Sequence, residues 1–250
     1  MTAAPLLTLD RGNSTLDAML HGDPPLRRRL AAGGDDHAAA AQLTALLGAI
    51  RPARCVAVSV VPGGLDGAER ALAGLGVSVL RVGRELRCPL PLDYDTPETL
   101  GADRWLGALA AHRSYGRAVV VDCGTATTVN LVEDDGAFRG GAIAPGLDAI
   151  LAGMSRVTPN LPAADPDGAW AMPPRSSAQA VHAGAVLAFC GAVERLVADT
   201  LRVARGPCAV VLTGGRAEVY LRHGRLRPRH EPDLVHQGLR RLAEEAGCVS

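Results

Sequence analysis

This chain carries the stretch Asp10-Arg11-Gly12-Asn13-Ser14-Thr15 near its start, and a related stretch returns as Asp122-Cys123-Gly124-Thr125-Ala126-Thr127. Both follow the pattern Asp-x-Gly-[Asn/Thr]-[Ser/Ala]-Thr, and each comes directly behind an apolar run of the kind that forms a buried strand. A motif that recurs in the same setting indicates an internal repeat. We therefore expect a duplicated α/β domain, with one acidic loop opening each half.

The chemistry of such a loop suits phosphate. Glycine has no Cβ, so the backbone can turn tightly and come close to a ligand. Successive backbone N–H groups and hydroxyls then form a concavity for phosphate oxygens, and an Asp at the strand end can hold Mg²⁺ against them. One loop alone is better explained as an Asx turn that caps its own backbone. Two matching loops favour an ATP-using phosphotransferase.

The rest of the sequence alternates between strand and helix patterns. Predicted strands cover 5–10, 14–21, 55–61, 77–82, 118–121, 127–132, 137–143 and 208–212. Predicted helices cover 36–50, 65–75, 97–111, 147–156, 177–204 and 234–246. The repeat divides the chain into an N-terminal half, 1–115, and a C-terminal half, 116–250.

The composition is that of a globular protein without a nucleic-acid surface. The 26 basic and 26 acidic residues balance to zero net charge, and every basic residue is an arginine. We interpret the short clusters Arg27–Arg29 and Arg225–Arg229 as solvated surface, so nucleic acid is not an expected partner. Because the chain has no lysine, phosphate charge must be neutralised by arginine, Mg²⁺ and backbone N–H groups.

The cysteines and histidines indicate a reduced protein without a structural metal. The six cysteines form no CxxC pair, and the seven histidines are scattered. This pattern fits a cytoplasmic location. The N-terminus does not resemble a signal peptide, and no apolar run approaches the ~20 residues of a membrane-spanning helix. We therefore expect a soluble protein with no membrane partner.

The paired loops resemble those of the actin-like ATPase (ASKHA) superfamily, whose two related domains clasp a nucleotide. More narrowly, the chain resembles type III pantothenate kinase, through segments that follow the family order over almost the whole chain. These segments are Asp10–Ser14, Ser59–Pro62, Tyr94, Gly101–Arg104, Asp122–Thr127, Gly140–Gly146, Leu161–Pro162, Thr213–Gly215 and Pro232–Leu234. The implied fold is α/β, with duplicated actin-like (ribonuclease H-like) domains of mixed sheets flanked by helices.

The resemblance implies a role for each matching residue. Asp103 would accept the proton of the substrate hydroxyl, Asp10 would hold Mg²⁺, and Asp122 would bind a monovalent cation, K⁺ or NH₄⁺. The implied ATP contacts are Asp10, Arg11, Gly12, Asn13, Ser14, Thr15, Leu16, Asp17 and Thr125. The implied pantothenate contacts are Tyr94, Gly101, Ala102, Asp103, Arg104 and Ser177.

The implied reaction is ATP-dependent phosphorylation of pantothenate to 4′-phosphopantothenate, the first step of coenzyme A biosynthesis. The family also implies a homodimer, assembled through the C-terminal half. Phosphoryl transfer has a loose transition state, so catalysis rests mostly on alignment and charge stabilisation. Asp103 would then need only to orient the hydroxyl and accept its proton, while Arg104 offers a planar fork for a carboxylate or phosphate.

Three positions depart from the family pattern. Asp17 stands where a basic residue is common, and its carboxylate would repel a nucleotide if it faced one. Ser14 replaces a threonine and keeps the hydroxyl. The pair Ser176-Ser177 replaces Asn-Thr, which keeps one hydroxyl and loses an amide.

Other interpretations stay open from the sequence. Asp103 also suits a helix N-terminus, Tyr94 a partly buried loop, and Gly140–Gly146 a simple strand-to-helix turn. At the level of function, one alternative is a non-catalytic accessory or regulatory relative of the same fold. Another is a kinase of the superfamily that acts on a different small hydroxylated or carboxylate substrate, such as a sugar or acetate. A phosphatase or kinase of the superfamily that acts on polyphosphate belongs to the same alternative.

Overall fold

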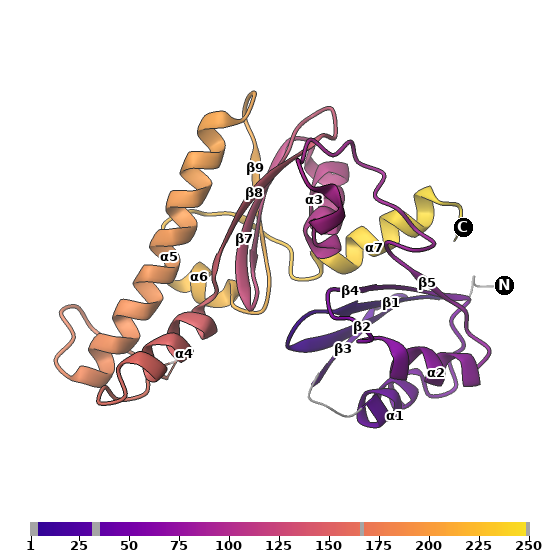
Figure 1. The fold of residues 1–250 in the computed structure, drawn as a ribbon, viewed down its shortest axis with the longest axis horizontal. Coiled ribbons are helices and arrows are strands. Elements are labelled where there is room, and N and C mark those ends of the chain that lie inside the picture. The colour runs from indigo at the N-terminus through magenta and orange to yellow at the C-terminus, as the bar shows by residue number, and fades with distance from the viewer. Residues whose placement is uncertain (1–4, 32–35, 166–167, 249–250) are drawn as a thin grey trace. The chain divides into compact units, whose positions relative to one another are not determined.

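The computed structural model of the chain describes residues 5–31, 36–165 and 168–248. Its contacts group the chain into two compact units, and each unit holds one five-stranded sheet (Figure 1). Unit 1 comprises the chain up to Pro91, Asp95–Ala110 and the segment from Asp233 onward, and unit 2 comprises Leu92–Tyr94 and Ala111–Pro232. This grouping differs from a single division after residue 115, because the C-terminal helix packs with unit 1.

Unit 1 combines its sheet with helices from both ends of the chain. Its strands are β1 (Leu6–Arg11), β2 (Thr15–His21), β3 (Leu26–Ala31), β4 (Arg54–Ser59) and β5 (Val79–Arg81). Its helical elements are α1 (Asp36–Leu47), α2 (Asp66–Gly74), a short 3₁₀ turn (Pro97–Thr99), the greater part of α3 (Ala102–Tyr115) and α7 (Leu234–Glu245).

Unit 2 repeats this plan with a longer covering helix. Its strands are β6 (Ala118–Cys123), β7 (Ala126–Val132), β8 (Phe138–Pro145), β9 (Ala209–Thr213) and β10 (Arg229–His230). Its helices are α4 (Leu147–Val157), α5 (Ser177–Val203) and α6 (Ala217–His223).

The two sheets have the same topology, strand for strand. The order is β3-β2-β1-β4-β5 in unit 1 and β8-β7-β6-β9-β10 in unit 2. In each unit the first three strands pair antiparallel, and the first, fourth and fifth pair parallel. Each acidic loop joins the first two strands of its sheet. This match confirms the internal repeat that the two loops predicted.

The two faces of the unit 1 sheet carry different side chains, because successive residues of a strand point to opposite sides. Leu7 and Leu9 face a core that includes Leu43, Leu47 and Leu72, contributed by α1 and α2. The opposite face carries Thr8 and Asp10, and α7 packs there against β1 and β4. Figure 1 shows α7 and α1 on opposite sides of this sheet. The side chain of Asp10, at the start of the acidic loop, thus lies on the face of the sheet that α1 and α2 do not cover.

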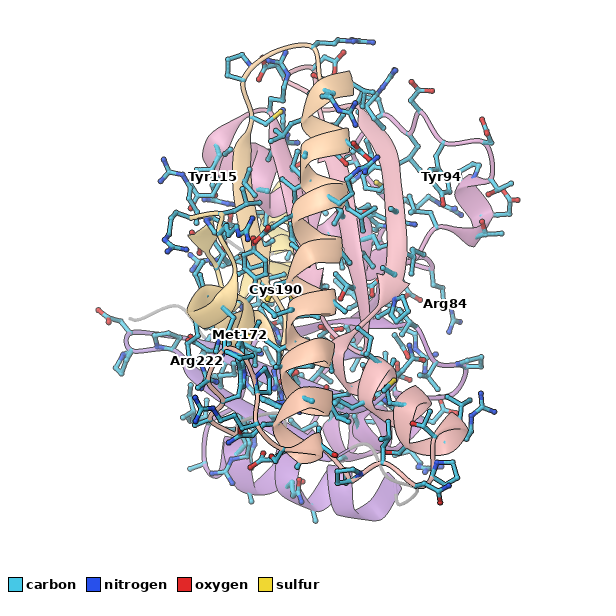
Figure 2. All side chains as sticks on the ribbon, turned by 90° about the vertical axis from the view of Figure 1, so that its left-hand side faces the viewer. Arg84, Tyr94, Tyr115, Met172, Cys190 and Arg222 are labelled. Atoms are coloured by element: carbon cyan, nitrogen blue, oxygen red, sulfur yellow. The ribbon has the colours of Figure 1, made fainter. Side chains whose placement is uncertain are left out.

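Helix α5 corrects one expectation from the sequence. By length and composition it is apolar enough to cross a membrane, so an apolar segment of that length does exist. Its buried residues, however, form part of the unit 2 core: His182, Ala183, Ala185, Val186, Phe189, Cys190, Val193 and Val197. Cys190 lies midway along the helix (Figure 2). The burial explains the apolar composition as that of a core helix.

The sequence did not predict β3, β10 or α6. The segment Leu26–Leu30 is rich in arginine, which hides the alternation of a strand. In the structure Arg27 and Arg29 both form ion pairs with Asp17 of β2, so neither is only solvated surface, although the Arg29 side chain remains 51% exposed. Arg28, on the other face, is exposed. Edge strands often carry charged residues because these block unwanted pairing with other chains.

A pair of histidines joins α7 to the sheet of unit 1. The Thr8 hydroxyl lies 2.9 Å from His21 Nε2 and 2.8 Å from His236 Nδ1. Burial, aided by the positive charge of Arg240, lowers the pKa of His21 to about 4, although Asp233 and Glu244 oppose the shift. Burial also lowers the pKa of His236 to about 3. Both imidazoles are therefore neutral in the folded protein at neutral pH.

This cluster predicts that unfolding becomes easier in mild acid. Below about pH 6.5 the unfolded chain binds protons that the folded chain does not, so the free energy of unfolding falls as pH drops towards the folded pKa values. Each histidine contributes up to about 1.4 kcal/mol per pH unit. His21→Gln should flatten this decline in urea unfolding curves between about pH 6.5 and pH 5. His230→Gln, in unit 2, is the control, and an unchanged slope in His21→Gln would refute the assignment.

Candidate active site

The first acidic loop lies between β1 and β2 of unit 1. Asp10 is partly exposed near the end of β1, directly opposite Asp17 of β2. Asn13 and Ser14 are exposed at the tip of the loop. The short hairpin therefore presents backbone N–H groups, an amide and a hydroxyl beside a carboxylate, which is the set of groups that a magnesium-bound phosphate requires.

Two of the predicted ATP contacts point to the other face of the sheet. Arg11 and Leu16 are paired in register, one residue beyond the Asp10–Asp17 pair. The side chain of Leu16 is only 2% exposed and belongs to the core. The guanidinium of Arg11 donates to the carbonyls of Gly12 and Thr15. The Arg11 side chain therefore stabilises the loop, and the Leu16 side chain stabilises the core.

Asp17 is buried, with 6% of the residue exposed, but its charge is balanced. Arg29 Nε lies 3.1 and 3.2 Å from its two carboxylate oxygens, and Arg27 Nη2 lies 3.4 Å from Oδ1. A buried carboxylate requires such partners, because leaving it unpaired costs several kcal/mol, on the order of 3–5. The repulsion of a nucleotide that the sequence suggested is thus offset by two guanidinium groups.

Asp103 lies in the first turn of α3, two residues after Gly101. Its Oδ1 accepts a hydrogen bond of 2.9 Å from the backbone N–H of Arg104. The same oxygen would lie 2.6 Å from a Cβ placed on Gly101, so glycine makes the room that the carboxyl occupies. A regular helix start, rather than a flexible loop, therefore holds this carboxyl in place.

The surroundings of Asp103 strengthen it as a proton acceptor. Burial raises the pKa of this carboxyl above its usual range, and this effect outweighs the opposing influence of the Arg104 N–H and guanidinium. Arg104 itself is only 8% exposed, and its positive charge acts on the Asp103 carboxyl. A carboxylate with a raised pKa takes a proton more readily, which suits general-base catalysis.

The second acidic loop lies between β6 and β7 of unit 2. Asp122 is paired with Thr128 of β7 and with Thr213 of β9. Gly214 follows with a φ of +98°, and a Cβ there would lie 2.3 Å from Asp122 Oδ1. The carboxylate therefore lies against the bare backbone of Gly214, in space that no other residue type would leave.

The tip of this second loop packs on the start of α4. Thr125 is exposed, and its carbonyl accepts a hydrogen bond of 3.2 Å from the N–H of Gly146. A Cβ on Gly146 would lie 2.3 Å from the Gly124 carbonyl oxygen and 2.6 Å from that of Thr125. The glycine-rich segment thus forms a strand-to-helix turn and also permits a close approach of two backbones.

Tyr94 belongs to unit 2, whereas Gly101–Arg104 belong to unit 1. The Tyr94 ring lies edge-on to Phe138 with centroids 6.1 Å apart, and a Cβ on Gly140 would lie 3.3 Å from it. The preceding Asp93 donates its N–H to the Phe138 carbonyl at 3.0 Å and forms an ion pair with Arg139. Strand β8 therefore positions Tyr94, which is partly exposed and labelled in Figure 2.

Ser176 and Ser177 divide their roles at the start of α5. Ser176 is the N-cap, and its hydroxyl accepts a hydrogen bond of 3.3 Å from the N–H of Gln179. Ser177 is the first helical residue and is exposed. The helix cap thus uses the hydroxyl of Ser176, while that of Ser177 faces outward.

The predicted residues fall into two sets. Unit 1 holds Asp10–Asp17 and Gly101–Arg104, and unit 2 holds Asp122, Thr125, Tyr94 and Ser177. Sequence reasoning did not single out Arg29 or the contact of Gly214 with Asp122. For Arg29 a signal existed: arginines at 27 and 29 alternate along one face of a strand. For Gly214 the signal was its place directly behind a predicted strand.

Two sheets of identical topology, each with an acidic loop between its first two strands, define the class of this protein as the actin-like ATPase fold. A ROK family glucokinase from Streptomyces griseus, solved in complex with glucose and AMPPNP, is similar with a TM-score of 0.57. The likeness covers 96% of this chain and 99% of that chain at 10% sequence identity, so it shows a shared fold.

Sequence comparison gives the particular family. Residues 6–199 match the family model for type III pantothenate kinase. The type III pantothenate kinase of Rubrobacter xylanophilus is 37% identical over 218 residues, 82% of this chain and 81% of that protein. The one from Zymomonas mobilis is 33% identical over 259 residues, 96% of this chain and 92% of that protein. This chain belongs to the type III pantothenate kinase family, whose members phosphorylate pantothenate in coenzyme A biosynthesis.

Proposed function

We propose that this chain transfers the γ-phosphoryl group of ATP to the primary hydroxyl of pantothenate, with Asp103 as the proton acceptor. The observation that carries this assignment is the Asp103 carboxyl, held over Gly101 by the Arg104 N–H and given a raised pKa by burial. A bond forms between the hydroxyl oxygen and the γ-phosphorus, and the bond from that phosphorus to the β–γ bridging oxygen breaks. The hydroxyl proton passes to Asp103, and ADP leaves.

Family membership implies ATP and a divalent metal. We assign the phosphates to the loop Asp10–Ser14, whose exposed tip offers N–H groups, the Asn13 amide and the Ser14 hydroxyl, and add Thr125 as a further ATP contact. Asp10 fits Mg²⁺, because this ion takes hard oxygen ligands and is usually bound by one or two carboxylates together with phosphates and water. When bound, Mg²⁺ neutralises charge on the phosphates.

Pantothenate has a carboxylate as well as its hydroxyl, so it requires a cation and polar contacts. Arg104 adjoins Asp103 and can form the two parallel hydrogen bonds that a carboxylate accepts. Gly101 and Ala102 are the residues directly before Asp103, and we propose them as further contacts of the substrate at the helix start. Tyr94 and the exposed hydroxyl of Ser177 complete the proposed substrate contacts.

Asp122 is the proposed ligand of a monovalent cation, K⁺ or NH₄⁺. Its carboxylate is partly exposed and lies against the backbone of Gly214, with the loop backbone at Gly124 also close to its Oδ1. A carboxylate among backbone groups suits a weakly hydrated cation that takes several oxygen ligands.

We further propose a cytoplasmic homodimer formed through unit 2. This unit exposes Ile143 of β8, Val157 of α4 and Met172, each with more than 60% of its surface open to solvent. Figure 2 labels Met172. The family implies a dimer, and burial of these side chains against a second copy would remove their apolar surface from water, which favours association. Sedimentation as a single chain of 25.8 kDa would contradict the dimer.

A coupled assay of ADP release tests the proposed function. We expect turnover that requires pantothenate, that K⁺ or NH₄⁺ stimulates, and that glucose or acetate does not replace. Asp122→Asn should lose most of the K⁺ stimulation, because a neutral amide attracts a cation far less than a carboxylate does. Asp135→Asn, at the exposed turn between β7 and β8, is the control. Turnover that occurs only with a sugar or acetate, or that ignores K⁺, would overturn the corresponding part of the proposal.

A further inference from the structure

We propose that Arg29 binds the ATP phosphates directly, and that Asp17 is the positioning residue that holds it there. This inference rests on the assignment of ATP to the Asp10 loop. The starting observation is a charge requirement: a triphosphate brings several negative charges to a loop that already holds Asp10, and the chain has no lysine to meet them. Beside Mg²⁺ and backbone N–H groups, the only side-chain cation that the chain can supply at this loop is an arginine, and the sheet face that carries Asp10 is where such an arginine would lie.

The strand register places Arg29 on that face. Asp10 of β1 is opposite Asp17 of β2, and Asp17 is opposite Arg29 of β3. Directly opposed residues of antiparallel strands point to the same side. Since strands lie about 4.8 Å apart, Arg29 starts about 10 Å from Asp10, a distance that its own side chain or a triphosphate spans.

The other arginines of this sheet region serve elsewhere. The guanidinium of Arg11 donates to the carbonyls of Gly12 and Thr15, and its side chain starts from the opposite face. Arg28 also lies on the opposite face, opposite Ala18. Arg27 bridges Asp17 and Asp233 at the start of α7, which ties it to that helix. Among the arginines described on β1 to β3, Arg29 is thus the best placed for a ligand beside Asp10.

The contact between Arg29 and Asp17 leaves Arg29 suited to a second anion. Both hydrogen bonds to Asp17 come from Nε, at 3.1 and 3.2 Å, so they use one edge of the guanidinium. The Asp17 side chain is 9% exposed, whereas that of Arg29 is 51% exposed. A guanidinium has five N–H donors in a rigid fork, so one carboxylate does not exhaust it. Asp17 thus holds the Nε edge of the Arg29 guanidinium, and the two terminal nitrogens of Arg29 remain for a second anion.

A purely structural role for Arg29, that of neutralising buried Asp17, makes a different prediction for a double variant. If Arg29 only balances Asp17, then removing the Asp17 charge should repair the damage caused by removing Arg29. If Arg29 binds phosphate, the loss should persist without Asp17. The variants Arg29→Gln, Asp17→Asn and Asp17→Asn/Arg29→Gln form the cycle that separates the two roles.

The test measures equilibrium binding of ATP–Mg²⁺ and of a non-hydrolysable analogue by calorimetry, together with the KM for each substrate. We expect Arg29→Gln to weaken ATP binding about tenfold or more, and to leave the KM for pantothenate within about threefold, because a charge-assisted hydrogen bond to phosphate is lost. Arg29→Lys should recover most of the affinity. The double variant should bind ATP as weakly as Arg29→Gln, and Arg28→Gln is the matched control on the opposite face.

Two results would overturn this inference alone: ATP affinity unchanged in Arg29→Gln, or affinity restored in the double variant. The binding readout needs no pantothenate, so it remains decisive if the wild-type protein binds ATP but phosphorylates a different acceptor. A wild-type protein that does not bind ATP–Mg²⁺ would refute both the inference and the ATP assignment. If Arg29→Gln unfolds, the double variant decides, because it leaves no buried carboxylate unpaired: ATP binding about tenfold weaker than in Asp17→Asn supports a phosphate-binding Arg29, and equal binding overturns it.

Discussion

Replacing Asp103 with asparagine is expected to lower kcat for pantothenate phosphorylation by about 10²–10⁴-fold, the usual contribution of a positioned general base. The lower end of that range is more consistent with a loose transition state, in which proton transfer lags behind bond cleavage. The asparagine has the same shape and keeps an oxygen for the Arg104 N–H, so the start of α3 should stay intact. Binding of ATP should change little.

The pH profile sharpens this prediction. Burial raises the pKa of Asp103, and the group must be ionised to accept a proton. Activity should therefore fall with decreasing pH at a value above the usual range of a carboxyl group, and this acid limb should be absent in Asp103→Asn. Asp95→Asn removes an exposed carboxylate of unit 1 and is the matched control. An Asp103→Asn enzyme with a normal kcat and an unchanged acid limb would eliminate Asp103 as the base.

The second large effect is expected from Gly214→Ala. A positive φ costs an alanine roughly 1–2 kcal/mol. At this position the new Cβ would also lie 2.3 Å from Asp122 Oδ1 and 2.5 Å from the backbone of Cys123, so the loop must shift. We expect the free energy of unfolding to fall by roughly 3 kcal/mol or more, the range in which buried clashes act, and K⁺ stimulation to disappear.

Gly48→Ala separates the clash from the backbone strain. Gly48 also has a positive φ, +52°, but nothing lies within 4 Å of its Cβ position. This variant should lose only the roughly 1–2 kcal/mol of backbone strain and keep its K⁺ response. Denaturant unfolding of both proteins measures the difference. Equal losses in the two variants would show that the packing of Gly214 against Asp122 does not matter.

The sequence was sufficient for the repeat and for most of the elements, because these depend on local patterns. The paired Asp-x-Gly loops gave the duplicated fold, and the two sheets have the same strand order. Apolar runs such as Ala118–Val121 are buried strands, as their composition indicates. The helix start at Gly101–Arg104 also follows from local chemistry, since a glycine before an acidic first turn is a common helix signal.

What escaped prediction depends on neighbours that are distant in sequence. From the sequence, the carboxylate of Asp17 was expected to repel a nucleotide. The register of β2 and β3 places Arg29 against it, which offsets that charge. The contact of Gly214 with Asp122 joins strands more than 90 residues apart, and no local pattern encodes it. Strand β3 was missed because its arginines obscure the alternation. Packing also determines to which face of the sheet a side chain points. Leu16 was among the residues that the family resemblance assigned to ATP, yet its side chain lies in the core.

The most direct test of the central claim is phosphorus NMR of the product formed from ATP, Mg²⁺, K⁺ and pantothenate. Phosphoryl transfer to the primary hydroxyl should give a phosphate monoester signal split by one adjacent CH₂ group, in equal amount to ADP, and the signal should grow at least about a hundredfold more slowly with Asp103→Asn. Release of inorganic phosphate alone, or ADP formation without that monoester, would contradict the claim that Asp103 directs ATP to the hydroxyl of pantothenate.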